Sequence, residues 1–357
     1  MPAASDTCLS HDWHLRLQQQ AVTDHIPLSG TLELTYRCNL NCIHCYCNEP
    51  ATSRGTEQEL TTAEWCATID QIADLGGLWL LFTGGECLLR PDFKELWIHA
   101  KKRGLLLTLF TNGTLITSEL AQFLRDWPPY SVEVTIYGST PATCLSVTRT
   151  PNSLAACLAG IDYLCQQGIK PKLKTMILRH NHTELNAIQS IAERLGLEFR
   201  FDAQPHARPG ASPGSVESFR LSPDQVADLD RDDCIRWQAW QDFAATIVPK
   251  SGSRTLFPCS AGLSTFHITP YGSLQLCGMI PDLAWDLRNG SFHEGWHHAL
   301  PQHREATVEV SQCFTCEHFD LCNQCPGWST VEHNHLLKPV EFLCQVTKAR
   351  AKLLTAS

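Results

Sequence analysis

Between residues 31 and 202, six short apolar segments alternate with five segments that have helical periodicity. The expected strands are 31–36, 78–83, 105–111, 131–137, 172–178 and 197–202. The expected helices between them are 62–75, 91–103, 118–125, 153–167 and 183–195. Strands that alternate with helices form parallel sheets, and strands as apolar as 105–111 are typical of burial on both faces. The pattern therefore predicts an α/β fold with a parallel sheet.

Short motifs follow the first three of these strands. They are Cys38-x₃-Cys42-x₂-Cys45, Gly84-Gly85-Glu86 and Thr111-Asn112-Gly113. In a parallel barrel the reactive groups gather at the carboxyl ends of the strands, so we expect these motifs to lie together. Three thiolates this closely spaced can hold three irons of a 4Fe–4S cluster and leave the fourth iron open. The cysteine motif alone leaves a zinc site or a disulfide as alternatives.

Together these motifs resemble the radical S-adenosylmethionine (SAM) superfamily, which has a CxxxCxxC loop after its first strand and a GGE after its second. His44 stands where that family usually has an aromatic residue. The resemblance implies a partial (β/α)6 TIM-like barrel and a 4Fe–4S cluster on Cys38, Cys42 and Cys45 that binds SAM. It also implies reductive cleavage of SAM to a 5′-deoxyadenosyl radical, which abstracts hydrogen from a substrate. An electron donor such as flavodoxin or ferredoxin is expected.

The resemblance also assigns the SAM contacts by position. Backbone carbonyls of Gly84 and Gly85 and the carboxylate of Glu86 would bind the SAM ammonium. The candidates for hydrogen bonds to ribose or methionine are Thr111, Asn112 and Thr135. Arg149 would bind the SAM carboxylate, because arginine pairs with carboxylates bidentately; a surface arginine is the alternative. Tyr46 and Phe82 would flank the adenosine, with plain packing as the alternative.

A second cysteine set begins after residue 257 and surrounds an expected β-hairpin over 264–277 with Gly272 at its turn. Its order and spacing resemble the SPASM extension of radical SAM enzymes, which holds two auxiliary 4Fe–4S clusters. The resemblance assigns an outer cluster to Cys313, Cys316, Cys322 and Cys344. It assigns an inner cluster to Cys259, Cys277 and Cys325.

Two features depart from that pattern. Cys322 and Cys325 are separated by two residues where three are usual, and the inner cluster has no evident fourth ligand. The alternative is a zinc ribbon, in which one zinc ion is bound by the two Cys-x₂-Cys pairs at 313–316 and 322–325.

These features divide the chain into four parts. We expect a leader segment at 1–29, a radical SAM partial barrel at 30–203, a linker with bridging helices at 204–255 and a SPASM domain at 256–357. The leader segment has a helical patch but is too short for a folded peptide-recognition domain.

Composition indicates the compartment of the protein and the partners that it can have. The chain has 18 cysteines, and in a reducing cytosol cysteines in ligand-like spacings indicate metal binding or catalysis before disulfides. A net charge of −9 argues against a nucleic-acid partner. No apolar run reaches the length of a membrane span, and residues 1–20 lack the layout of a secretory signal. We therefore expect a cytoplasmic protein with no membrane partner.

The substrate is inferred from the SPASM resemblance. Most members of that group modify ribosomally made peptides or proteins by crosslinking, thioether formation or epimerisation, so a peptide maturase is expected, with direct leader binding or a separate leader-binding protein. The alternatives are modification of a small molecule such as a tetrapyrrole side chain, or sulfatase-type oxidation of Cys or Ser. The last is disfavoured because the turn at 268–272 lacks the usual Asp. A non-catalytic iron–sulfur carrier would not need the GGE motif.

Overall fold

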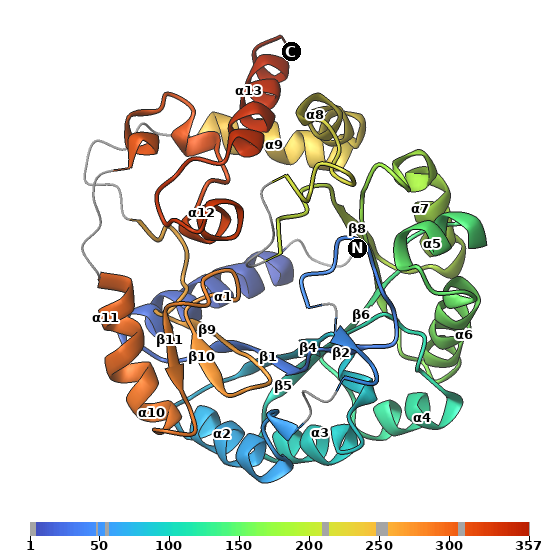
Figure 1. The fold of residues 1–357 in the computed structure, drawn as a ribbon, viewed down its shortest axis with the longest axis vertical. Helices are drawn as coiled ribbons and strands as arrows, with labels where there is room; N and C mark the ends of the chain where they lie inside the picture. The colour runs from blue at the N-terminus through green and yellow to red at the C-terminus, as the bar shows by residue number, and fades with distance from the viewer. Residues whose placement is uncertain are drawn as a thin grey trace.

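The computed structural model describes residues 5–47, 49–53, 57–208, 214–247, 256–305 and 311–356 (Figure 1). Six parallel strands lie side by side in chain order. They are β1 (Ser29–Thr35), β4 (Trp79–Gly84), β5 (Leu106–Thr111), β6 (Ser131–Thr135), β7 (Lys172–Met176) and β8 (Phe199–Asp202). Each expected strand is present within two residues of its predicted ends, and the predicted α/β fold with a parallel sheet is confirmed.

Helices connect these strands and surround the sheet on its outer side (Figure 1). They are α2 (Thr62–Asp74), α3 (Phe93–Lys102), α4 (Ser118–Asp126), α6 (Ser153–Gln166) and α7 (Leu185–Leu195), with the turn η3 (His182–Glu184) before α7. The N-cap of helix α2 is Thr61, whose hydroxyl forms a capping box with the Glu64 carboxylate. Helix α5 (Pro141–Thr148) was not expected, because its eight residues carry little amphipathic pattern.

Side-chain alternation along the strands separates the core from the lumen of the barrel. On β1, Leu32 and Leu34 are fully buried in the cluster that contains Trp65 and Ile69 of α2. Because successive side chains of a strand point to opposite faces, Glu33 between them faces the lumen. The strands therefore contribute their apolar residues to packing against the helices and their polar residues to the interior of the barrel.

The C-terminal hairpin continues this sheet. Strand β9 (Thr265–Ile268) pairs in parallel with β1, and β10 (Ser273–Gln275) and β11 (Ala284–Asp286) follow as antiparallel neighbours. The result is one nine-stranded sheet in the order β11-β10-β9-β1-β4-β5-β6-β7-β8. The hairpin was expected, whereas its attachment to the first barrel strand was not.

The linker and the C-terminus also pack against the barrel. Helices α8 (Pro223–Asp232) and α9 (Cys234–Thr246) lie beside α13 (Glu341–Ala356) (Figure 1). Asp230 of α8 accepts from Arg350 at 2.6 Å, and Arg220 before α8 pairs with Glu332 of α12 (Pro326–His333) at 2.5 Å. The predicted division of the chain into four parts stays a prediction.

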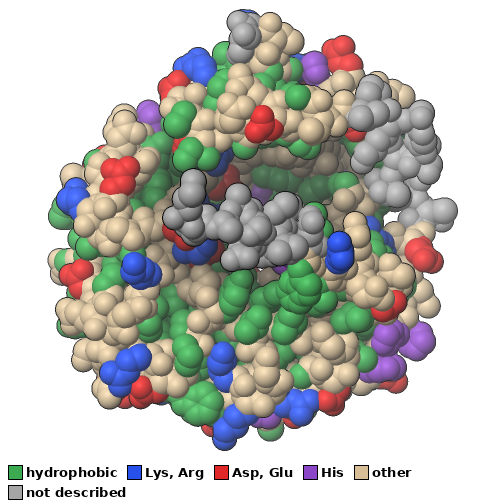
Figure 2. Space-filling model, turned by 180° about the vertical axis from the view of Figure 1, so that it is seen from behind, with side chains coloured by type: hydrophobic (Ala, Val, Ile, Leu, Met, Phe, Trp, Pro, Cys, Tyr) green, Lys and Arg blue, Asp and Glu red, His purple; other side chains and the backbone are tan. Residues whose placement is uncertain are grey.

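The remaining elements are short, apart from the N-terminal helix. They are α1 (Ser5–Thr23), β2 (Arg37–Cys38), β3 (Glu49–Pro50), η2 (Cys87–Leu89), α10 (Phe292–Glu294), the π-helical turn η4 (Gly295–Ala299), α11 (Leu300–Glu305), η5 (Gln312–Thr315) and η6 (Phe319–Leu321). Within the described residues, none of the helices has the length and apolar character needed to cross a membrane. On the face opposite to that of Figure 1, hydrophobic side chains gather around a central hollow (Figure 2).

Candidate functional site

The cysteine loop begins where β1 ends, at the carboxyl edge of the sheet. Cys38 closes β2, and Cys42 and Cys45 follow in the loop. The amides of Asn41 and Ile43 donate to the carbonyls of Thr148 and Val147 at 3.0 Å each, which fastens the loop to the end of α5. The loop is therefore held by the barrel on one side and by α5 on the other.

The three thiols of this loop influence one another electrostatically. Burial raises the pKa of Cys42 well above its usual value, and the Cys45 and Cys38 thiols raise it further. Burial likewise raises the pKa of Cys38 to about 12, with Cys45 adding to it. Three neighbouring thiolates repel each other unless a cationic centre lies between them, so this donor set suits a metal cluster.

Two buried nitrogen atoms near the cysteines of this loop lack hydrogen-bond partners among the described residues. Arg37 Nε and His44 Nδ1 are buried and have no hydrogen-bond partner within the described part of the chain. Buried polar atoms normally find a partner. These two nitrogens, one before Cys38 and one after Cys42 in the sequence, are therefore available to hydrogen-bond a bound polar group at this loop.

The GGE loop is attached directly to the strand that leads into the cysteine loop. The amide of Gly85 donates to the Thr35 carbonyl at 2.7 Å, and that of Glu86 to the Arg37 carbonyl at 2.8 Å. Gly84 has a φ of +132°, and a Cβ at this position would come within 2.2 Å of the Thr35 oxygen. Only glycine allows this close approach, which brings the second strand's motif beside the first.

The carboxylate of Glu86 is directed into the protein. It is fully buried and accepts from the Asn112 amide at 2.8 Å, the Leu88 amide at 3.2 Å and the Thr111 hydroxyl at 2.9 Å. Burial raises the pKa of Glu86 to about 7, against the effect of these donors. The carboxylate thus joins β4 to the end of β5. The assignment of Gly84, Gly85 and Glu86 to the SAM ammonium stays a prediction.

Asn112 connects the third motif to the first. Its side-chain amide donates to the Asn39 side-chain oxygen at 2.9 Å and lies 3.7 Å from the Cys38 sulfur. Thr111, one residue earlier, is buried and bonded to Glu86. The three motifs predicted to lie together are therefore in contact.

The other expected SAM contacts lie at varying positions. Thr135 ends β6, and its carbonyl faces the Cys157 sulfur at 3.8 Å. Arg149 follows α5 in a left-handed conformation and has an exposed side chain. The ring of Tyr46 is partly exposed, while its hydroxyl donates to Glu33 at 2.6 Å. These three assignments stay predictions.

The expectation for Phe82 was wrong. Phe82 is fully buried and packs edge-to-face on Phe93 and Trp97 of α3, with ring centroids 6.5 and 5.6 Å away. The alternation of β4 turns it to the helix side of the sheet, so it cannot flank a ligand in the lumen.

The C-terminal cysteines fall into two neighbourhoods. Burial raises the pKa of Cys277, and the Cys325 and Cys259 thiols raise it further. Burial also raises the pKa of Cys344 to about 11, with contributions from Cys322, Glu341, Cys313 and Cys316. The first group contains the three cysteines expected to hold the inner cluster, and the second contains the four expected to hold the outer cluster.

The outer set lines a cavity of about 390 Å³. Its lining includes Cys313, Cys316, Cys322 and Cys344. Cys325, which a zinc ribbon would require here, does not line this cavity, and the Cys259 and Cys322 thiols both raise its pKa. Among the described residues, no three His, Cys, Asp or Glu side chains converge as ligands of one metal ion. The cavity and its four thiols fit a cluster with one thiolate on each iron.

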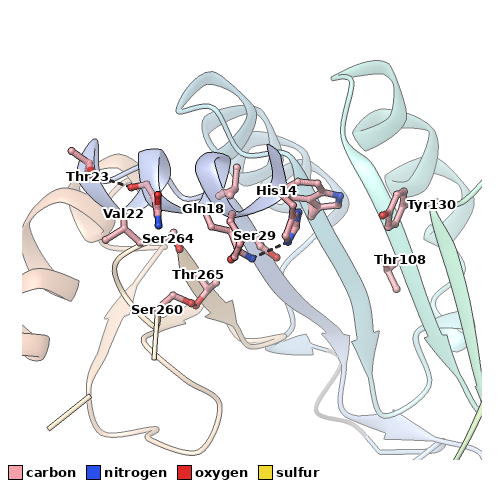
Figure 3. Close-up of a pocket in the computed structure, with 14 residues that line it drawn as sticks. His14, Gln18, Val22, Thr23, Ser29, Thr108, Tyr130, Ser260, Ser264 and Thr265 are labelled. Atoms are coloured by element: carbon pink, nitrogen blue, oxygen red, sulfur yellow. Dashed lines mark hydrogen bonds between the residues drawn. The ribbon is translucent and has the colours of Figure 1, made fainter. Parts of the chain in front are cut away.

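A larger cavity lies at the other end of the strands. It measures about 920 Å³ and lies between α1 and the first residues of β1, β4 and β9 (Figure 3). Figure 3 shows His14 and Gln18 of α1 on one side and Tyr130 on another. Reactive groups in parallel barrels lie at the carboxyl ends of strands, so this cavity is separate from the candidate site.

Sequence reasoning missed several polar residues of the lumen. Glu33 and His267 are hydrogen-bonded at 2.9 Å, and the ring of Tyr137 lies 5.2 Å from that of His44. A charged residue between two leucines of a buried strand was the available signal for Glu33. No local pattern could pair it with a residue 234 positions later.

The part of the chain that carries the three motifs is similar to known proteins. Residues 32–195 match the Radical SAM superfamily model, and this range contains all three motifs. Residues 32–195 form a radical SAM domain. Radical SAM enzymes use a 4Fe–4S cluster and SAM. The assignment of the cysteine loop and the GGE loop to these cofactors stays a prediction.

Two curated relatives and one solved structure extend the comparison. The AdoMet-dependent heme synthase of Methanosarcina barkeri is 29% identical over 314 residues, covering 82% of this chain and 89% of the relative. The PqqA peptide cyclase of Xanthomonas campestris is 29% identical over 280 residues, covering 76% and 74%. The structure of Streptococcus suis SuiB bound to precursor peptide SuiA has a TM-score of 0.67 at 14% identity, covering 93% and 80%. The radical SAM fold thus extends over most of this chain.

Removing one thiol of the outer set tests the assignment of that set. We expect Cys344→Ala to lose about four irons per chain, while formation of 5′-deoxyadenosine from SAM stays within about twofold, because the SAM-binding loop is untouched. Iron analysis after anaerobic reconstitution measures this. Cys234→Ala, at an exposed position on α9, is the matched control. Full iron content in Cys344→Ala would exclude Cys344 as a ligand.

Proposed function

We propose that this chain is a radical SAM maturase that oxidatively modifies a ribosomally made peptide. The observation that supports the proposal is the continuous sheet. The loop with Cys38, Cys42 and Cys45 follows β1, and Cys259 and Cys277 flank the hairpin of β9 and β10, in which β9 pairs with β1. A cluster beside the reacting centre can accept an electron from a substrate radical. Such an arrangement suits a net oxidation.

The roles of the residues follow from their positions. Cys38, Cys42 and Cys45 would hold the 4Fe–4S cluster, which when bound supplies the electron that cleaves SAM. The carbonyls of Gly84 and Gly85 orient the SAM ammonium, because Glu86 fixes their loop to β5. Arg149 and Thr135 remain candidates for the SAM carboxylate and ribose.

The auxiliary sets complete the proposed cofactor inventory. The inner set, Cys259, Cys277 and Cys325, would hold one cluster, and the cavity of the outer set would hold another. A reducing cytoplasm keeps these thiols free, and a flavodoxin or ferredoxin would supply electrons. A separate leader-binding protein, or the maturase itself, would hold the leader of the peptide.

A peptide substrate is supported by the similarity to a peptide cyclase and by the likeness in fold to a SuiB structure that holds a precursor peptide. A tetrapyrrole is the second candidate, favoured by the 29% identity to a heme synthase along most of both chains. The two substrates demand different surfaces. A peptide needs an extended groove, and a tetrapyrrole needs cations for its carboxylates.

The decisive experiment uses the anaerobically reconstituted full chain. We expect about twelve irons per chain for three clusters, and 5′-deoxyadenosine after addition of SAM and dithionite. Peptides synthesised from reading frames beside the gene, and iron coproporphyrin, are then added separately and analysed by mass spectrometry. A mass change of a peptide supports the proposal, and a change of the porphyrin alone replaces it with the second candidate. Absence of 5′-deoxyadenosine would refute both.

A further inference from the structure

Glu33 and His267 form a hydrogen-bonded pair inside the barrel that the proposed chemistry has not used. Glu33 lies on β1 and His267 on the neighbouring parallel strand β9, which Figure 1 shows side by side. Their closest atoms, Glu33 Oε2 and His267 Nε2, are 2.9 Å apart. Both side chains face the lumen, because the neighbouring Leu32, Phe266 and Ile268 fill the core on the helix side.

The carboxylate of Glu33 is completely removed from solvent and fully engaged. It accepts from the Tyr46 hydroxyl at 2.6 Å, and Tyr36 also hydrogen-bonds to it. Burial alone would raise the pKa of Glu33, but His267, Tyr46 and Tyr36 outweigh it and hold the pKa below the ordinary value. Glu33 is therefore ionised at neutral pH. The charge of Glu33 in turn raises the pKa of the Tyr36 and Tyr46 hydroxyls and of the Cys47 thiol.

An ionised Glu33 determines the tautomer of His267. A carboxylate can only accept hydrogen bonds, so His267 Nε2 carries a proton and Nδ1 is the free acceptor of a neutral ring. The carboxylate also stabilises the imidazolium that forms when Nδ1 takes up a proton. A buried carboxylate that orients a histidine is the arrangement in which histidine acts as a base.

The Glu33–His267 pair has neighbours in both the SAM-cluster loop and the inner cysteine set. Tyr46 directly follows Cys45 of the SAM-cluster loop. The ring of His267 lies against Gly278, where an added Cβ would come within 2.8 Å of its Cε1 atom. Gly278 directly follows Cys277 of the inner set. A proton on His267 would therefore lie beside the inner cluster.

We propose that His267, oriented by Glu33, accepts the proton released when the substrate radical is oxidised. The inference rests on the proposed function. Once a substrate hydrogen atom has passed to the 5′-deoxyadenosyl radical, formation of a thioether, for example, releases one proton and one electron: R• + R′S–H → R–S–R′ + H⁺ + e⁻. The electron passes to an oxidised 4Fe–4S cluster held by Cys259, Cys277 and Cys325, and the proton passes to Nδ1 of His267.

A purely structural role explains the pair less well. Buried ion pairs contribute little net stability compared with apolar side chains of similar size, and the strand positions on either side of Glu33 are leucines. His267 retains 12% exposure of its side chain, whereas Glu33 has none. The histidine thus remains accessible from the lumen while the carboxylate stays behind it.

The test measures the inner cluster without any substrate. If His267 takes up a proton when that cluster is reduced, the midpoint potential of the cluster falls as the pH rises. Redox titrations of reconstituted protein, followed by electron paramagnetic resonance at several pH values between about 6 and 9, measure this. Cys277→Ala identifies the signal of the inner cluster by its loss.

We expect the potential of the wild type to depend on pH, and that of His267→Gln to be independent of pH. In Glu33→Gln the dependence should move to lower pH, because the imidazolium loses its counter-charge. The matched control is His99→Gln, since His99 forms a similar pair with Asp70, also at 2.9 Å, on the outside of the barrel. It should behave as the wild type.

Product formation gives the second readout once the deoxyadenosine assay has identified a substrate. His267→Gln should form 5′-deoxyadenosine within about twofold of wild type but make product roughly 100-fold more slowly, the usual effect of losing a general base. A potential whose pH dependence is unchanged in His267→Gln would overturn the inference. So would equal losses of product and deoxyadenosine in a variant with full iron content. Failure of the proposed function differs, because the wild type would then form no deoxyadenosine.

Discussion

Replacing Cys42 with alanine is expected to abolish cleavage of SAM. Cys42 is the most buried of the three loop thiols, at 8% exposure, and the other two raise its pKa. A cluster held by the two remaining thiolates has lost one of the three protein ligands that leave a single iron open for SAM. We expect a loss of about four irons per chain and at least roughly 100-fold less 5′-deoxyadenosine, the scale on which loss of a cofactor ligand acts.

The matched control for this substitution is Cys165→Ala. Cys165 lies on α6, is partly buried, and packs against the hydrophobic core away from the three motifs. It should retain full iron content and normal deoxyadenosine formation. If Cys42→Ala protein with a normal near-ultraviolet spectrum still cleaved SAM, the loop would not hold the reactive cluster. Removing the inner or outer clusters alone should leave SAM cleavage in place, which separates the three sites.

The strands of the barrel could be predicted because their patterns are local. The strand expected at 31–36 is observed as Ser29–Thr35, and that expected at 131–137 as Ser131–Thr135. Both contain β-branched and apolar residues between turn signals. The motifs at the strand ends could be placed together because parallel strands share one carboxyl edge.

Contacts between distant segments could not be predicted in this way. The pairing of β9 with β1 joins residues more than 230 positions apart, and no local pattern encodes it. The same pairing brings His267 to Glu33. Helices α12 and α13 were not predicted either.

The hydrogen bonds of Glu86 could not be predicted from its position in the motif. The resemblance assigns its carboxylate to the SAM ammonium, which stays a prediction, and the structure shows that this carboxylate accepts from Thr111, Leu88 and Asn112. The sequence position of a motif residue thus identifies the loop but not the direction of its side chain. Burial and hydrogen bonding decide that direction.

Replacing Glu86 with alanine is accordingly expected to destabilise the site. The substitution leaves two backbone amides and one hydroxyl buried without their acceptor. Each unsatisfied buried donor costs on the order of 1 kcal/mol or more, so the free energy of unfolding should fall by about 3 kcal/mol. Urea unfolding followed by tryptophan fluorescence measures this change. SAM binding should weaken as well, because the Gly84 and Gly85 carbonyls lose the tie that orients them.

The pH dependence of the free energy of unfolding distinguishes the loss of the buried Glu86 carboxyl group from a simple loss of packing. Burial raises the pKa of Glu86 from 4.5 in the unfolded chain to about 7 in the fold. The unfolded chain therefore releases its proton first, and the wild type should lose stability as the pH rises from about 4.5 to 7. Glu86→Gln, which cannot ionise, should lack this slope. Glu119→Ala, at an exposed carboxylate of α4 paired with Lys94, should keep it. An unchanged slope in Glu86→Gln would show that another group titrates in this range.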